Sequence, residues 1–188
     1  MRDLSLHLMD IVQNSIKAQA SKIDIILTAD AENDKFIIEI EDNGIGMDES
    51  LLNQVKNPFA TTRTTRKVGL GIPLLEASSA RAGGKLEIKS EKGKGTCIKA
   101  DFQISHIDRL PLGNIGETMM GLVAANPETD FNLNLCNMKE NFAFSVLEIK
   151  EQLDDVPIDN SDVLIWIRDY ISEGIKVIFG GVLNEIDS

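Results

Sequence analysis

A carboxylate and two glycines lie close together at Asp42, Gly44 and Gly46, where an alternating apolar run meets a short polar stretch. The run at residues 36–41 alternates as a half-buried strand does, so Asp42 is expected at a strand end with its carboxylate free to accept hydrogen bonds. The glycines leave no side chain between the main chain and a ligand. An Asn-Gly pair also favours a hairpin turn, but the stretch from Met47 onward is typical of a helix start. We therefore expect a ligand to approach this backbone closely.

A second set of polar side chains, Asp10, Asn14 and Lys17, follows at four- and three-residue steps. Apolar residues around them are spaced for one face of a helix over about residues 4–20, so the three polar side chains stack along another strip. A solvated helix face with a weak ion pair would give the same strip. Asn14 is a poor helix former in mid-helix, however, which favours a functional reason for it. We expect His7 to be a packing or surface residue and not a phosphoacceptor.

A third feature is the Gly-x-Gly of Gly69, Leu70 and Gly71, followed by Pro73 and a helical stretch at 74–82. Proline suits a first helical turn, so these glycines lie where unpaired amides and the helix dipole favour an anion. A flexible hinge is the alternative. The preceding loop, which has no regular period, suits a phosphate cover but also an exposed linker. Its basic and hydroxyl candidates are Thr61, Thr62, Arg63, Arg66 and Lys67.

The composition of the chain limits its partners. The 188 residues carry a formal net charge of −11, which disfavours nucleic acid and anionic membranes because both have the same sign. Cys97 and Cys136 lack metal-site spacing and are expected as buried thiols, which suits a cytoplasmic, reducing setting. We see no basic-then-apolar leader and no long apolar run, so we expect neither secretion nor a membrane span.

The stretches between these features predict two hairpins. Residues 23–27 and 36–41 form strands around a polar turn, and residues 85–90 and 96–102 form strands around a glycine-rich turn. The order of parts is therefore a helix with Asp-x-x-x-Asn, a strand ending in Asp-x-Gly-x-Gly, a basic loop, a Gly-x-Gly that opens a helix, and a Gly-Thr that opens a strand.

That order resembles the ATP-binding domain shared by gyrase, heat-shock chaperones, histidine kinases and MutL, the GHKL superfamily with its Bergerat fold. The resemblance covers about residues 4–103: residues 10–18 are similar to the asparagine box, 42–46 and 68–71 to the two glycine boxes, and 58–63 to the lid entry of histidine kinases. It implies an α+β fold, a Bergerat-type two-layer α/β sandwich with a mixed, mainly antiparallel sheet and helices on one face. We divide the chain into this ATP-binding domain, residues 1–104, and a small C-terminal α+β module of unknown role, residues 105–188.

The resemblance also implies roles for single residues. Asn14 would coordinate Mg²⁺, which bridges the triphosphate oxygens. Asp42 would accept the adenine amino group, and Thr96 would support the base from the neighbouring strand through water. The implied ATP-binding residues are Asn14, Asp42, Gly44, Gly46, Met47, Thr61, Thr62, Arg63, Arg66, Lys67, Gly69, Leu70, Gly71 and Thr96.

The two catalytic candidates, Asp10 and Lys17, favour different branches of the superfamily. Lys17 matches a lysine that lies near the phosphates in many histidine kinases. Asp10 stands where hydrolytic members carry a Glu that activates water, and it is one methylene shorter, so a weak base, a group that positions metal-bound water and a plain helix-face carboxylate all stay open. Slow ATP hydrolysis, phosphoryl transfer to a partner protein, and a non-catalytic ATP-dependent switch are therefore all candidate functions.

Because the asparagine-box helix begins within the first residues, we expect no helical hairpin with a phosphoacceptor His before it, and the chain resembles stand-alone members such as anti-sigma-factor kinases more than a complete autophosphorylating histidine kinase. We expect a separate protein partner or substrate, and a homodimer is compatible with the sequence. A scaffold with a decayed nucleotide site is disfavoured because the motif residues are intact.

Residues from about 105 to 188 show no resemblance by which we can assign a family. Their pattern predicts a helix at 116–125, a hairpin of strands at 131–135 and 142–146, a helix at 147–153, and a last helix capped by Asn160. Residues 175–179 are ambiguous between helix and strand. Trp166 and Tyr170 are expected in the core, with partner docking or self-association as the alternative.

Overall fold

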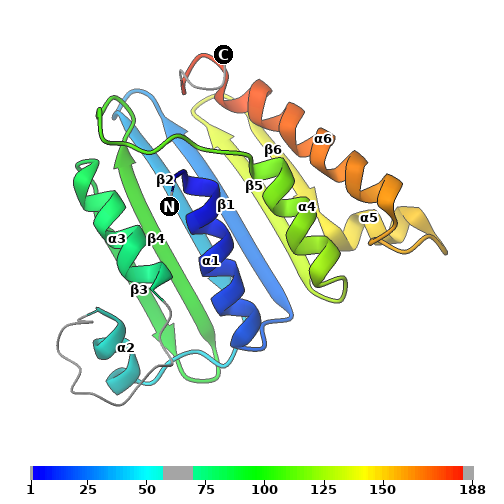
Figure 1. The fold of residues 1–188 in the computed structure, drawn as a ribbon, viewed down its shortest axis with the longest axis horizontal. Helices are drawn as coiled ribbons and strands as arrows, with labels where there is room; N and C mark the ends of the chain where they lie inside the picture. Colours follow the sequence, from blue (N-terminus) through cyan, green and yellow to red (C-terminus); the bar gives the residue numbers. More distant parts are fainter. Residues whose placement is uncertain (1, 57–69, 184–188) are drawn as a thin grey trace.

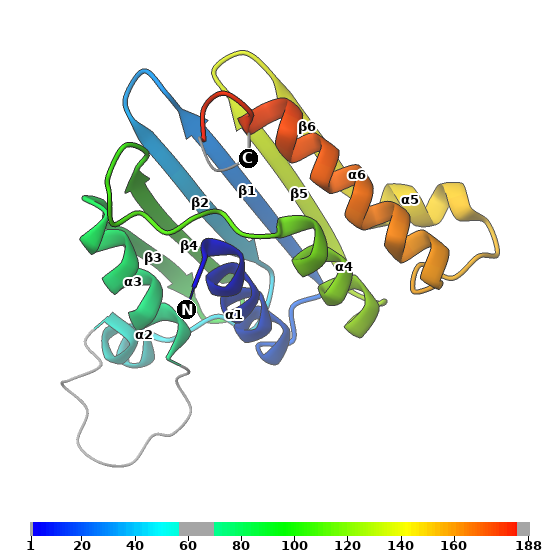
Figure 2. The same ribbon diagram turned by 45° about the horizontal axis from the view of Figure 1, so that its top comes forward.

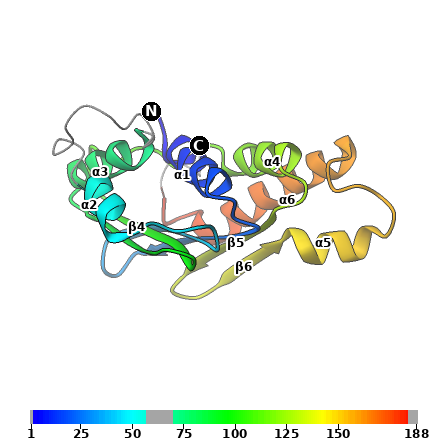
Figure 3. The same ribbon diagram turned by 90° about the horizontal axis from the view of Figure 1, so that it is seen from below.

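The computed structural model describes residues 2–56 and 70–183. Within them, one sheet has the strand order β3-β4-β2-β1-β5-β6 (Figure 1). Helices α1, α3, α4 and α6 lie on one side of this sheet (Figure 3). The α+β class, the mixed sheet and the placement of helices on one face, all predicted from the sequence, are thereby confirmed.

The sheet is antiparallel at every pair except β1 and β5, which are parallel. In β1 and β2 every second residue is buried under the helices, as the alternating sequences predict. Both predicted hairpins are confirmed. The strands are β1 (Lys22–Asp30), β2 (Lys35–Asp42), β3 (Leu86–Glu91), β4 (Gly95–Gln103), β5 (Asp130–Asn137) and β6 (Asn141–Ser145).

Helix α1 begins where the Asp3 carboxylate caps it by accepting a hydrogen bond of 3.0 Å from the amide of Leu6. It ends at Lys17 and not at the predicted Ala20, because Gln19 adopts a left-handed φ of 61° that no helix can continue through. The helices are α1 (Leu4–Lys17), α2 (Glu49–Lys56), α3 (Gly71–Arg81), α4 (Ile115–Ala125), α5 (Val146–Leu153) and α6 (Ser161–Phe179).

The C-terminal residues extend the sheet of the N-terminal half. Strand β5 pairs with β1 from Lys22↔Asp130 to Ala29↔Asn137, and β6 follows at the edge (Figure 2). The hairpin and helices predicted after residue 115 are confirmed, and residues 175–179 are the end of α6. The boundary at residue 104 stays a prediction, but strands from both sides of it share one sheet.

A single hydrophobic core runs under all of these elements and joins the two halves. The rings of Phe36 on β2 and Phe179 at the end of α6 meet edge to face with centroids 5.7 Å apart, and both are fully buried. Helices α4 and α6 approach closely at Gly116, where a Cβ atom would lie 2.6 Å from the carbonyl oxygen of Arg168.

Two predictions about the core were wrong. Trp166 and Tyr170 stack on each other with centroids 4.9 Å apart, but they are 49% and 40% exposed. The buried stripe of α6 begins one residue later, at Ile167 and Ile171, so the aromatic pair faces outward. Cys97 and Cys136 are free thiols, as expected, but they are half-buried because they lie on the sheet face opposite the helices.

Candidate functional site

Asp42 ends strand β2 under helix α1, and only 7% of its surface is exposed. Its Oδ2 atom accepts a hydrogen bond of 2.6 Å from the hydroxyl of Ser15, and its Oδ1 atom accepts one of 2.9 Å from the amide of Gly44. Charge-assisted bonds of this kind fix a carboxylate firmly. Each carboxylate oxygen keeps a further lone pair, so Asp42 is an oriented acceptor that can still take hydrogen bonds from a ligand.

The glycines after Asp42 are required by the packing of the protein itself. A Cβ atom on Gly44 would lie 2.6 Å from the carbonyl oxygen of Ala18 at the end of α1. Gly46 has a φ of +62°, and a Cβ atom there would collide with the carbonyl of Glu91 in the β3–β4 turn. The amide of Ile45 also bonds to the Ala18 carbonyl oxygen at 2.9 Å. The loop is therefore clamped between α1 and the β3–β4 turn.

Thr96 lies directly across from Asp42 in the β2–β4 register and across from Ser90 in the β3–β4 register. The Ser90 and Thr96 hydroxyl oxygens are 2.8 Å apart. Ser90 also accepts a hydrogen bond of 2.8 Å from the amide of Met47 and donates one of 2.9 Å to the carbonyl oxygen of Gly95. Ser90 thus joins the loop after Asp42 to the strand that carries Thr96.

The asparagine-box strip of α1 faces the start of α3. A Cβ atom on Gly71, the buried first residue of α3, would lie 3.1 Å from Asp10 Cβ, 3.5 Å from Asp10 Oδ2 and 3.7 Å from Asn14 Nδ2. Both polar side chains therefore reach the same point beside Gly71, and any larger residue would fill it. The structure thus brings the predicted Asp10, Asn14 and Gly71 together.

The first turn of α3 leaves backbone donors without a side-chain partner among the described residues. Leu70 precedes the helix with 75% of its surface exposed, and no described side chain caps the first turn. Pro73 lies in that turn, as predicted. The amides of Gly71 and Ile72 therefore point out of a helix N-terminus beside Asp10 and Asn14, an arrangement that suits an anion.

Lys17 follows Asn14 along α1, and the remaining predicted residues of this set lie outside the described part of the chain. Lys17, in the last turn of α1, is exposed and forms no ion pair with a residue that the structure describes. Within residues 2–56 and 70–183, no group of three or more His, Cys, Asp or Glu side chains is arranged to hold a metal ion. The predicted residues outside the described part are Thr61, Thr62, Arg63, Arg66, Lys67 and Gly69.

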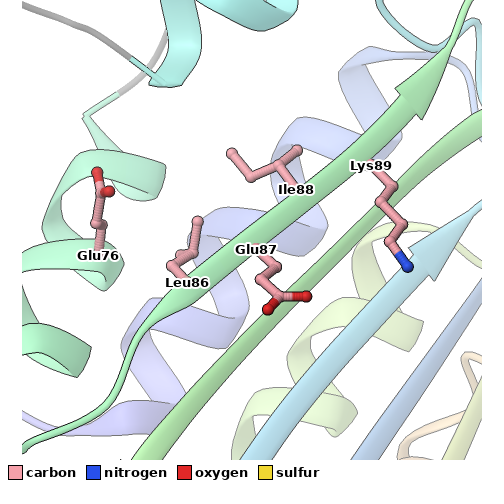
Figure 4. Close-up of a pocket in the computed structure, with 5 residues that line it drawn as sticks. All are labelled: Glu76, Leu86, Glu87, Ile88 and Lys89. Atoms are coloured by element: carbon pink, nitrogen blue, oxygen red, sulfur yellow. The ribbon is translucent and has the colours of Figure 1, made fainter.

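Two hollows in the surface lie near the β3–β4 hairpin. A cavity of about 270 Å³ is lined in part by Asp42, Ser90 and Thr96. A larger one of about 510 Å³ lies at the β3 edge, where Glu76 of α3 and the side chains of Leu86 and Ile88 border it (Figure 4). The larger cavity contains none of the predicted site residues. The smaller one includes Asp42 and Thr96 but not Asp10, Asn14 or Gly71, so it covers only part of the candidate site.

Sequence reasoning missed Ser15 and Ser90. The signal for Ser15 was its place directly after Asn14, but its bond to Asp42 spans 27 positions and no local pattern shows it. The signal for Ser90 was the register of the second hairpin, because a short turn forces Ser90 opposite Thr96.

Burial shifts the acidity of two groups near the site. It lowers the pKa of His7, a 3% exposed residue one turn before Asp10, below its ordinary value of 6.5, even though the carboxylates of Asp10 and Asp3 act to raise it. Burial is also the main cause of a raised pKa at the Cys97 thiol, with further contributions from the charges of Glu39 and Glu41. Both groups are therefore held in their neutral forms at neutral pH.

Comparison with known proteins gives consistent matches. The family model described as histidine kinase-, DNA gyrase B- and HSP90-like ATPase matches residues 2–106. The chain is 33% identical over 109 residues to the sensor protein kinase FleS of Pseudomonas aeruginosa, which is 58% of this chain and 26% of that protein. It is 34% identical over 89 residues to sporulation kinase E of Bacillus subtilis, 47% of this chain and 12% of that protein. The chain therefore corresponds to a small part of each kinase.

The fold also matches a solved structure. The N-terminal domain of a DNA repair protein superimposes with a TM-score of 0.50 and 18% identity, over 76% of this chain and 52% of that one. At this identity the match shows a shared fold alone. None of the helices in residues 2–56 and 70–183 has the length and apolarity needed to cross a bilayer.

Proposed function

Because the chain belongs to the histidine kinase-, DNA gyrase B- and HSP90-like ATPase family, we propose that it binds ATP with the adenine at Asp42 and the triphosphate beside α1 and the start of α3. The observation that carries the proposal is the buried carboxylate of Asp42, fixed by Ser15 and the amide of Gly44 with lone pairs to spare. An ionised carboxylate only accepts hydrogen bonds, so it suits the amino group of adenine and disfavours the oxygen that guanine carries at the same position.

The surroundings of Gly71 suit the phosphates and their cation. Asn14 and Asp10 bring polar side-chain atoms to one side of Gly71, and each side chain carries an oxygen, the donor that Mg²⁺ prefers. The free amides of Gly71 and Ile72 supply hydrogen bonds to phosphate oxygens. Magnesium, when bound, would neutralise the charge of the triphosphate. The predicted lid residues, Thr61, Thr62, Arg63, Arg66 and Lys67, together with Gly69, complete this proposal as phosphate contacts.

The proposed reaction is slow ATP hydrolysis or phosphoryl transfer to a partner protein. Asp10 is the candidate general base, since it lies beside Gly71, where the phosphates would bind. Its shorter side chain places the carboxylate farther from an attacking water than a Glu would, which favours slow turnover. Lys17, exposed at the end of α1, would contact phosphate or substrate.

A non-catalytic switch is the second candidate. The Met47 amide is held by Ser90 and lies two residues before α2 begins at Glu49, so binding at Asp42 and Thr96 would bias the segment that follows. In that case ATP would change the affinity for a partner protein without turnover. A protein partner, a role in signal transduction like that of the sensor kinases matched, and a possible homodimer belong to the proposal. A cytoplasmic setting agrees with the two free thiols.

The test is calorimetric titration of ATP, ADP and GTP with and without Mg²⁺, followed by phosphate release in the same sample. We expect ATP to bind in preference to GTP and more tightly with Mg²⁺. Asp42→Asn should lower the affinity for ATP by roughly tenfold or more, because an amide nitrogen then faces a donor. An Asp42→Asn protein that binds ATP as well as the parent would contradict the proposed site.

Asp10→Asn separates the two candidate functions. If Asp10 is the base, this variant should keep its ATP affinity and lose turnover, because the amide cannot take a proton. If the chain is a switch, the parent protein binds ATP without measurable turnover, and Asp10→Asn changes neither ATP binding nor ATP-dependent binding of a partner. Turnover that is equal in parent and variant would exclude Asp10 as the base.

A further inference from the structure

The hydrogen bonds of Ser90 determine which way the hydroxyl of Thr96 points. Ser90 has one hydroxyl hydrogen, and it is donated to the carbonyl oxygen of Gly95 at 2.9 Å, because a carbonyl can only accept. The 2.8 Å contact between the Ser90 and Thr96 hydroxyls must then use the hydrogen of Thr96. The amide of Met47 donates to the second lone pair of Ser90. Ser90 is thus fully paired, and Thr96 is left with lone pairs alone for any further contact.

The Thr96 hydroxyl, which can only accept a further hydrogen bond, lies beside a second acceptor, Asp42. Asp42 is the cross-strand partner of Thr96, and both line the same cavity. The Asp42 carboxylate has no hydrogen to donate, and Thr96 has already given its hydrogen to Ser90. The Asp42 and Thr96 side chains therefore present only acceptors to a ligand between them, from two adjacent strands.

We propose that Ser90 is a specificity-determining positioning residue, which makes Thr96 an acceptor and thereby helps the site to select adenine over guanine nucleotides. The proposal rests on the proposed function, in which the base lies at Asp42. An adenine amino group can donate to this edge directly. With a bridging water, every acceptor also receives a hydrogen: the amino group donates to the water, and the water donates to Asp42 and Thr96.

Guanine would leave one hydrogen-bond acceptor at this edge unpaired. Its oxygen is a third acceptor beside Asp42 and Thr96, and a single water has only two hydrogens to give, so one acceptor stays unpaired in a half-buried place. Without Ser90, the Thr96 hydroxyl can rotate and donate to the water or to the guanine oxygen. The penalty against guanine should then fall, whereas the bond between adenine and Asp42 is kept.

The test measures affinities for ATP and GTP by calorimetry in the parent and in Ser90→Ala. We expect the ratio of GTP to ATP dissociation constants to fall roughly tenfold, mainly through tighter GTP binding, as the removal of one unpaired buried polar group predicts. Ser90→Thr keeps a hydroxyl on a strand that tolerates β-branched residues, so its ratio of GTP to ATP dissociation constants should equal that of the parent. Ser105→Ala is the matched control, because it removes a hydroxyl bonded to Asp34 beyond the far end of β4.

Thr96→Val provides a second route that does not depend on how well Ser90→Ala folds. Thr96→Val removes the Thr96 hydroxyl as an acceptor, so it should also lower the ratio of GTP to ATP dissociation constants. Ser90→Ala added to Thr96→Val should cause no further change in that ratio. An unchanged ratio in both single variants, or an equal loss of ATP and GTP binding, would overturn the role of Ser90 while the ATP site stands. Absence of ATP binding in the parent would overturn the proposed function and this inference with it.

Discussion

The two ends of the sheet share one apolar core, but the β3-β4-β2 end adds a network of hydrogen bonds around a buried carboxylate. At the β3-β4-β2 end, Asp42, Ser15, Ser90 and Thr96 are tied by hydrogen bonds of 2.6–2.9 Å, and glycines keep the backbone close. At the β5-β6 end, fully buried apolar side chains such as Phe131, Leu133 and Ile171 pack between the strands and α4 and α6. The difference teaches that the hydrogen-bonded network at one end sets which ligand fits, whereas apolar packing, which dominates at the β5-β6 end, supplies stability. The two properties should therefore respond to different mutations.

The largest effect is expected from removing the apolar end. A chain of residues 1–104 leaves β1 without its parallel partner β5 and uncovers residues such as Ile25 and Leu27. We expect no cooperative thermal unfolding transition in circular dichroism and aggregation in size-exclusion chromatography. A chain shortened after Leu183 is the control and should behave as the parent. Cooperative, parent-like unfolding of residues 1–104 would show that these residues form an independent domain and would contradict a stabilising role for the β5-β6 end.

Phe179→Ala should separate stability from ligand binding. Its ring is fully buried against Phe36, so we expect a loss of about 3–5 kcal/mol in the free energy of unfolding, measured by urea denaturation. The affinity for ATP of the folded protein should stay within about twofold, because no site residue is touched. The half-exposed Trp166→Ala is the control, with an expected loss of about 1 kcal/mol or less. A large change in ATP affinity in Phe179→Ala would show that the two ends are coupled.

Gly46→Ala should lower the affinity for ATP, which Phe179→Ala should leave nearly unchanged. The left-handed φ and the collision with the Glu91 carbonyl should cost about 1–3 kcal/mol and shift the loop that carries Asp42 and Met47. We expect at least roughly a tenfold loss of ATP affinity. Gly93→Ala is a matched control, because Gly93 also has a positive φ of +82° but has no atom within 4 Å of the added Cβ. Equal losses of affinity in both variants would mean that strain alone, and not the position of the loop, is responsible.

The smallest expected effect is a pH dependence at His7. Burial lowers the pKa of His7 in the folded state, so the unfolded chain, with an ordinary pKa of 6.5, binds the proton more readily. The contribution of neutral His7 to stability is therefore fully present above pH 6.5 and is lost as the pH falls below it toward the folded-state pKa. Urea denaturation from about pH 5 to about pH 7.5 should show a flatter profile for His7→Gln than for the parent. Parallel profiles would exclude His7 as the titrating group.

Several features of the fold were predictable because their sequence signals are local. Asp42 at a strand end, Pro73 in a first turn and Asn160 as a cap each follow from a short pattern, and the structure confirms them. The hydrogen bonds that orient the site were not predictable in this way, since Ser15 and Asp42 are 27 positions apart. Register between distant strands, and not residue type, decides such contacts.

The C-terminal half was predicted as elements but not as an arrangement. Alternating residues at 131–135 identify a strand, but the same alternation suits an edge, a separate sheet or the β1 pairing that the structure shows. For α6, the isoleucines and the aromatics have the same helical spacing and differ by one position, so the pattern alone did not decide between Ile167 and Trp166 as the buried residue.

The parallel pairing of β5 with β1 has a consequence for how the protein is made. The side chains of Asn132 and Asp24 bond across this pair over 108 positions, so these contacts have a high sequence separation. At ordinary rates of translation, β1 would leave the ribosome roughly 5–20 s before β5 has been synthesised. During that interval β1 has an unpaired edge, and the site beside α1 rests on an incomplete sheet. The nucleotide end should therefore become functional only after β5 has emerged, so its folding should follow the synthesis of β5.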